Sequence, residues 1–167
     1  MNNKFMRLAA IAGVFTVAIA ANATTYTFNN VINGAQEVGP NSSTASGNAS
    51  GTYDDVSNML MINITVTGLT TNTTGAHLHE AAFGVNGPVI INFGGTGLTT
   101  YNHNNMYTLT GAQETAFLAS GTYVNIHTAT FQGGEVRGQL RPEVVPEPAT
   151  MVVLISGIAA MMKRRRK

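Results

Sequence analysis

The sequence predicts an all-β domain, an antiparallel β-sandwich or Greek-key barrel with one short helix. Two observations lead to this prediction. The central part of the chain is rich in Thr, Val, Asn and Gly, which favour strands and turns. Short runs of alternating apolar and polar residues recur along it, separated by Gly- and Asn-rich turns, as in sandwiches and barrels.

The strongest strand pattern covers residues 58–69, where Leu60, Ile62, Ile64 and Val66 alternate with polar residues. Similar but shorter patterns predict the other strands, at residues 25–28, 51–55, 75–80, 89–93, 106–109, 123–127 and 135–141. Two polar stretches interrupt these patterns: residues 41–50 are predicted to be a loop or a weakly ordered edge, and residues 94–105, which include His103, a loop.

One helix is expected at residues 112–119. Thr110 and Gln113 match a capping box, in which each side chain bonds the backbone of the other residue. Good helix formers follow, and Gly121 supplies a stop signal.

The amino-terminal residues 1–23 are predicted to be a secretory signal peptide. Lys4 and Arg7 precede an apolar run, and Ala21-Asn22-Ala23 fits the small-residue cleavage rule. A retained membrane anchor is the alternative, but the run is shorter than the roughly 20 apolar residues that span a bilayer. The mature chain is therefore expected to begin near Thr24.

Residues 144–167 contain, in order, Val-Pro-Glu-Pro-Ala-Thr at residues 145–150, an apolar run at 151–162 and a basic end. This arrangement resembles a PEP-CTERM sorting signal of Gram-negative bacteria. Its signature residues are Pro146, Glu147, Pro148, Arg164, Arg165 and Arg166. The apolar run is expected to form a short transmembrane helix with the basic cluster inside. The resemblance implies an exosortase-type sorting enzyme as partner, transient anchoring in the inner membrane, and export to the outer surface or extracellular matrix.

The charge of the expected mature domain, residues 24–143, argues against nucleic acid as a partner. It contains two arginines and seven acidic residues, a net charge of −5, which repels phosphate backbones. The chain has no cysteine, so disulfides do not stabilise it. Its stability is expected to come from the core or from bound metal.

Three histidines are the candidate metal ligands. His77 and His79 are two residues apart on a predicted strand, so they share one face, about 6.5–7 Å apart. His127 ends another alternating run. Imidazole suits copper and zinc, and three ligands leave an open position. The alternative is a structural role in which backbone groups hold the rings.

A further pair of residues, Glu135 and Arg137, lies on one face of the last predicted strand. A structural ion pair is the simpler interpretation, and such exposed pairs contribute about 0–1 kcal/mol. The alternative is that Arg137 holds a carboxylate or a loop near His127.

Four segments stand in order along the chain, at residues 34–38, 76–79 with 84–89, 123–128 and 133–140. Together they resemble the CHRD domain, which is named after chordin and also occurs in exported bacterial proteins. The likeness covers residues 25–141, with Gly39-Pro40 where the family tends to have two prolines. It implies the architecture more than a biochemical activity.

The histidine spacing is also similar to that of copper/zinc superoxide dismutase, in which His77, His79 and His127 would match copper ligands. The chain lacks that family's disulfide and zinc loop, and His103 is a doubtful fourth ligand. The likeness supports a superoxide-dismutase-like or immunoglobulin-like fold.

The acidic, Thr- and Asn-rich mature domain and the sorting tail indicate the function. We expect a non-enzymatic binding or structural component of the cell surface or exopolysaccharide matrix, with surface proteins as further partners. The alternative is a copper or zinc metalloprotein, with redox activity.

Overall fold

The structure, a computed structural model, describes residues 23–146. The predicted signal peptide up to residue 22, the predicted transmembrane helix at residues 151–162 and most of the sorting signal lie outside this range. Of the signature residues of that signal, only Pro146 is described, and it is exposed. Within residues 23–146, no helix is long and apolar enough to cross a membrane.

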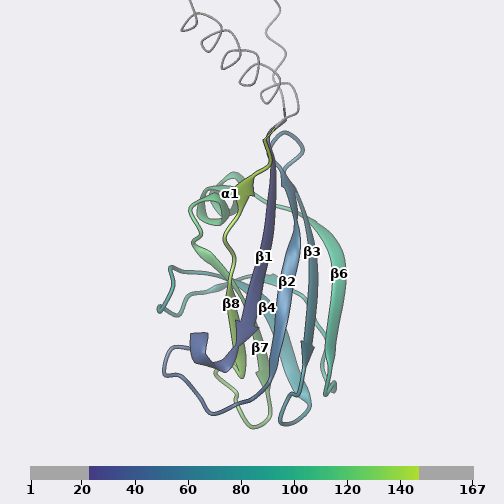
Figure 1. The fold of residues 1–167 in the computed structure, drawn as a ribbon, viewed down its shortest axis with the longest axis vertical. Helices are drawn as coiled ribbons and strands as arrows, with labels where there is room; N and C mark the ends of the chain where they lie inside the picture. The colour runs from purple at the N-terminus through teal and green to yellow at the C-terminus, as the bar shows by residue number, and fades with distance from the viewer. Residues whose placement is uncertain (1–22, 147–167) are drawn as a thin grey trace, which may run out of the picture.

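In the described part of the chain, nine strands form a single antiparallel sheet, with one α-helix and one 3₁₀ turn (Figure 1). The elements are β1 (Thr25–Asn33), the 3₁₀ turn (Gly34–Gln36), β2 (Ser46–Asp54), β3 (Met59–Thr67), β4 (Thr73–Glu80), β5 (Val89–Asn92), β6 (Tyr101–Thr108), α1 (Gly111–Leu118), β7 (Thr122–Thr128), β8 (Val136–Gln139) and β9 (Glu143–Val144). The strand order is β5-β4-β7-β8-β1-β2-β3-β6, and β9 pairs with β1. The predicted all-β class with one short helix is confirmed.

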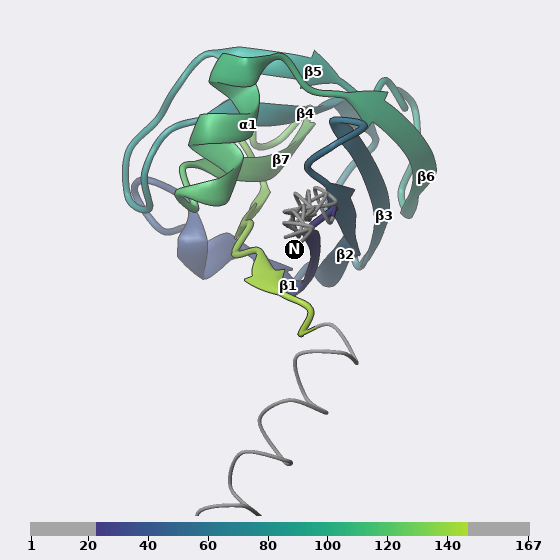
Figure 2. The same ribbon diagram turned by 90° about the horizontal axis from the view of Figure 1, so that it is seen from above.

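The sheet curls into a half-barrel, so that its two sides face each other across the core (Figure 2). Its edge strands come round toward each other. Phe93, directly after β5, packs on His103 and Tyr107 of β6 at ring-centroid distances of 5.0 and 5.5 Å. The inward-facing side chains of β3, at positions 60, 62, 64 and 66, are fully buried. The alternation predicted for this strand is confirmed.

Helix α1 covers one end of the curled sheet. Its capping box forms as predicted, with Gln113 N–H donating to the Thr110 hydroxyl and the Gln113 side chain accepting from Thr110 N–H. The buried Phe117 packs edge-on against Phe28 and Tyr53, with centroids 5.7 and 5.3 Å away. The residue with left-handed backbone after the helix is Ser120 (φ 57°), and not the expected Gly121.

Both predicted polar loops were wrong in part, because each contains strand residues. β2 begins at Ser46 and pairs along its length with β1 and β3. It needs glycine to fit, since a side chain at Gly47 would collide with the backbone of β3. β6 begins at Tyr101 and pairs with β3 through position 108, so His103 lies in a strand. Pairing with distant strands outweighs local polarity in both places.

The apolar run at residues 89–93 is compatible with a buried strand, but β5 is not buried. It is the last strand at one edge of the sheet, and Val89 is 49% exposed. An apolar run of this length does not distinguish a central strand from an edge strand.

Candidate metal centre

The antiparallel pairing of β4 with β7 brings the three candidate histidines together. His77 lies opposite Asn125, His79 opposite Tyr123, and His127 opposite Gly75. The inner positions of β4, Ala76 and Leu78, are fully buried in the core, so both β4 histidines point to the outer face. The predicted alternation of β4 is confirmed.

Gly75 leaves the space that the ring of His77 occupies. A Cβ atom at position 75 would lie 3.0 Å from Cε1 and 3.2 Å from Nε2 of His77. Without a side chain opposite His127, the imidazole of His77 folds back toward that residue. The ring centroids of His77 and His127 are 5.1 Å apart.

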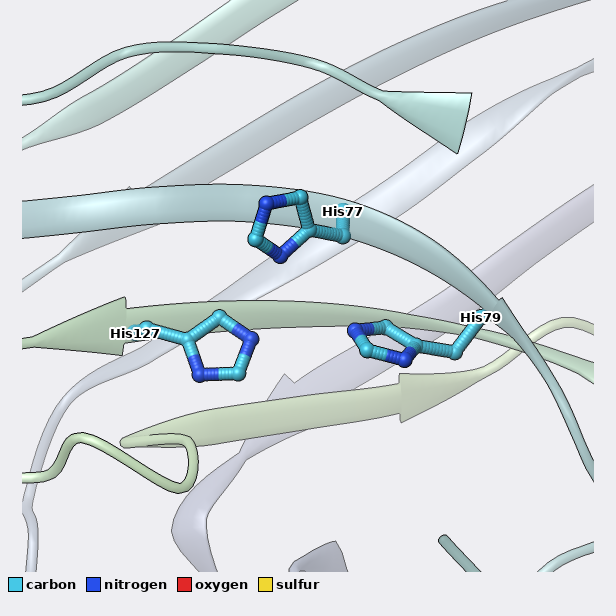
Figure 3. Close-up of side chains that lie close together, drawn as sticks. All are labelled: His77, His79 and His127. Carbon is cyan, nitrogen blue, oxygen red and sulfur yellow. The ribbon is translucent and has the colours of Figure 1, made fainter. Parts of the chain in front are cut away.

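The three imidazoles face a shared space (Figure 3). The ring centroid of His79 lies 5.6 Å from that of His77 and 5.8 Å from that of His127. One nitrogen from each ring can be chosen so that all three lie within 4.8 Å of one another. Metal–nitrogen bonds of about 2.0–2.1 Å require the nitrogens to lie closer together than this, so a bound ion would draw the three rings inward.

Each histidine keeps one buried ring nitrogen without a hydrogen-bond partner in the described part of the chain. These atoms are His77 Nδ1, His79 Nε2 and His127 Nε2. The other nitrogen of His79, Nδ1, lies 2.9 Å from the carbonyl oxygen of Gly87, and Nδ1 of His127 lies 2.9 Å from that of Gln132. A carbonyl only accepts, so both Nδ1 atoms donate, and Nε2 presents its lone pair. Metal-ligating histidines are commonly oriented in this way.

The surroundings of His77 and His79 favour the neutral form of their imidazoles. Burial, followed by the proximity of His127 and His79, lowers the pKa of His77. Burial also lowers the pKa of His79, and the nearby His127 and Arg137 add to this although the bond to Gly87 opposes it. Neutral imidazole is the form that coordinates metal ions.

Tyr123 fixes the orientation of His79. Its ring is stacked on the imidazole with a centroid distance of 4.9 Å and an interplanar angle of 12°. Its hydroxyl accepts a hydrogen bond from Gly87 N–H at 3.1 Å, and the Gly87 carbonyl accepts from His79. Gly87 has no room for a side chain, because a Cβ atom there would collide with the carbonyl of Glu80.

Arg137 fastens the loop between β4 and β5 over this face. The side chain is fully buried, and its guanidinium lies 3.5 Å from the centroid of the Tyr123 ring. It donates to the carbonyls of Val85 and Ala82 at 2.9 and 3.0 Å and to Gln139 Oε1 at 2.9 Å. Burial of an arginine requires that many of its donors be used in this way.

The expected surface pair of Glu135 with Arg137 was wrong. Both side chains are fully buried and have separate partners. Arg137 does hold a loop, as the alternative expected: it is the loop between β4 and β5, whose Gly87 bonds His79.

His103 does not join the three histidines. It lies on β6, which pairs with β3, and its Nε2 is 2.9 Å from the Tyr107 hydroxyl. Its ring is stacked with those of Tyr101 and Tyr107. The structure therefore gives it a place in an aromatic cluster, away from the candidate metal ligands.

Two polar residues beside the site escaped the sequence analysis, Glu37 and Asn125. Glu37 is only 8% exposed and accepts a hydrogen bond from Asn125 Nδ2 at 3.4 Å. Burial raises the pKa of Glu37 to about 7, although Arg137 and the bond from Asn125 both act to lower it. No local pattern reveals this contact, because 88 residues separate the two side chains in the chain.

Comparison with known proteins identifies the family of this chain. No curated protein and no solved structure matches the chain significantly. Residues 28–140, which include all three histidines, Glu37 and Arg137, match the CHRD domain family. Because the match covers more than half of the sequence, the chain belongs to the CHRD domain family.

Proposed function

We propose that this protein binds a copper or zinc ion through His77, His79 and His127, as a non-enzymatic component of the cell surface or exopolysaccharide matrix. One observation carries the metal site: the three histidines bring ring nitrogens within 4.8 Å of one another, and each histidine has one buried ring nitrogen without a hydrogen-bond partner. A buried polar atom without a partner costs about 1–3 kcal/mol, and three in one place are expensive for a purely structural cluster. A metal ion would satisfy all three.

A binding role is favoured over hydrolysis by the residues around the histidines. Within residues 23–146, the three histidines form a cluster that no carboxylate joins. A metal-bound water at such a site would have no adjacent carboxylate as general base. The metal would instead tie β4 to β7 and leave one coordination position for a donor group of a partner.

The export route is the second part of the proposal. We propose that residues 1–23 are removed as a signal peptide and that an exosortase-type enzyme recognises residues 144–167. The places where the ends leave the domain support this. Val144 pairs with Tyr26, and Val145 N–H donates to the carbonyl of Thr25, so both end segments depart from neighbouring strands. β9 is exposed, and processing there would leave the core intact.

Metal analysis of the purified protein tests the site directly. Protein stripped with chelator and then incubated with copper or zinc should retain about one ion per chain after desalting. The His79→Ala variant should retain none, whereas His103→Ala, which changes a histidine outside the cluster, should retain the full amount. Equal retention by the two variants, or none by the unaltered protein, would reject the site.

A further inference from the structure

The three-histidine site has an unusual distribution of charge around it. All three candidate ligand atoms are imidazole nitrogens, so the ligands bring no negative charge to a bound ion. Glu80 follows His79 directly, but it is exposed and faces away from the histidines, where solvent screens it.

A buried positive charge lies one aromatic ring away. His79 stacks on one side of Tyr123, and the guanidinium of Arg137 lies over the same ring. Because β7 lies between β4 and β8, the two groups approach Tyr123 from opposite sides. Arg137 is fully buried and bonded to two loop carbonyls, so its charge is fixed in place. A guanidinium stays protonated at every relevant pH.

The carboxylate of Glu37 neutralises the positive charge of Arg137 only in part. Glu37 is the acidic group that interacts with Arg137, and it lies on the side of Asn125 rather than among the histidines. Its pKa of about 7 leaves it only partly ionised at neutral pH. A bound ion therefore experiences a net positive field.

We propose that the site prefers monovalent copper, Cu(I), to the dications Cu(II) and Zn(II). This inference rests on the proposed metal site. Repulsion by Arg137 is twice as large for a dication as for a monocation, because Coulomb energy is proportional to the charge of the ion. Three neutral nitrogens satisfy Cu(I), which accepts low coordination numbers, whereas zinc requires a fourth ligand. At a separation on the order of 10 Å and an effective dielectric constant of about 20, one unit of charge changes the affinity roughly tenfold.

Affinity measurements on charge variants test this preference. Cu(I) affinity is measured without oxygen by competition with bicinchoninate, and Cu(II) affinity by competition with glycine, both at pH 7, where Glu37 is only partly ionised. We expect the unaltered protein to bind Cu(I) more tightly. Arg137→Gln should lower the ratio of the Cu(I) to the Cu(II) affinity roughly tenfold. Arg137→Lys, which keeps the charge, should preserve the ratio, and Glu37→Gln should raise it.

The outcomes separate this inference from the metal site itself. Tighter binding of Cu(II) than of Cu(I), or an unchanged ratio in folded Arg137→Gln and Glu37→Gln, would overturn the preference and leave the site standing. Absence of any copper binding by the unaltered protein would overturn both. Far-UV circular dichroism reports whether Arg137→Gln folds, and if it does not, an unchanged ratio in Glu37→Gln suffices to reject the preference.

Discussion

Thr70 donates two hydrogen bonds to the same carboxylate oxygen of Glu135, one from its backbone N–H and one from its hydroxyl, each 2.8 Å long. Ser43 donates to that oxygen at 2.6 Å, and Thr128 donates to the other at 2.7 Å. Glu135 thus joins the segment before β2, the loop after β3 and the end of β7. These contacts close the end of the sheet opposite α1 (Figure 1).

Replacing Glu135 with Gln should destabilise the fold by about 2–4 kcal/mol at pH 7, because hydrogen bonds to a charged acceptor are lost and an amide N–H₂ faces hydroxyl donors. Urea unfolding of the variant measures this. Glu143→Gln is the matched control, since Glu143 is exposed. Equal midpoints for the two variants would contradict the structural role.

The same carboxylate should make the fold sensitive to acid. Burial alone would raise the pKa of Glu135, but its bonds from Ser43, Thr128 and Thr70 outweigh burial and lower the pKa below its usual value. Its contribution to stability is therefore complete above the unfolded pKa and is lost as pH falls through the folded pKa. The difference in unfolding free energy between the unaltered protein and Glu135→Gln should shrink below pH 4.5. If the difference in unfolding free energy between the two proteins grows as the pH falls, the ionised Glu135 carboxylate does not stabilise the fold.

Glu37 should have the opposite effect on stability. Its folded pKa of about 7 lies above the usual 4.5, so its contribution is complete at low pH and is lost as pH rises through 7. Glu37→Gln should be more stable than the unaltered protein at pH 8 by about 1–3 kcal/mol and similar to it at pH 4.5. Thermal or urea unfolding of both proteins at the two pH values measures the difference in stability at each pH. The same difference in stability at both pH values would exclude a buried Glu37 that titrates in this range.

Local patterns in the sequence were sufficient for the elements whose residues alternate clearly, such as β3 and β4, and for the capped helix α1. They also predicted that His77 and His79 share one face. They failed where distant strands decide the outcome, as for β2 and for β6, which contains His103. The supports of the site are non-local in the same way, because Arg137 reaches loop residues 52 and 55 positions away.

Two variants of Tyr123 separate its two contributions to the site. Tyr123→Phe removes the hydrogen bond from Gly87 N–H but keeps the ring between His79 and Arg137, and it should cost about 0.5–1.5 kcal/mol of stability. Tyr123→Leu also removes the stacking and the cation–π contact, which contribute roughly 1–3 kcal/mol more. Metal affinity should fall further in Tyr123→Leu than in Tyr123→Phe, as titration with copper would show. Equal affinities would indicate that the ring does not orient His79.

Truncation of the chain after Thr150 tests the proposed sorting signal. Removing residues 151–167 deletes the apolar run and the basic cluster, so the protein should appear in the medium or periplasm without membrane retention. Cell fractionation and immunoblotting of both forms measure this. The sorting proposal fails if the truncated and full-length proteins fractionate alike and the full-length protein is never processed.

Metal-dependent stability gives the most direct test of the three histidines acting together. An ion that binds only the folded state raises stability by about 2.7 kcal/mol when its free concentration is 100 times the dissociation constant. Zinc and Cu(II) should each raise the melting temperature relative to chelator-treated protein, and Cu(II) should bind more tightly than zinc at these nitrogen ligands. Because protons compete for the ring nitrogens, the gain should be smaller at pH 5.5 than at pH 7.5.

His79→Ala should abolish this shift, because it removes one ligand from β4 and breaks the bond to the Gly87 carbonyl. His103→Ala should keep most of it, since the aromatic cluster on β6 is separate from the site. If the histidines are only structural, no metal changes the melting temperature at either pH. His79→Ala then costs its hydrogen bond, about 0.5–1.5 kcal/mol, and its stacking on Tyr123, but no metal-dependent stability. A melting temperature that neither metal changes would therefore reject the three-histidine site, even if all the strands fold as described.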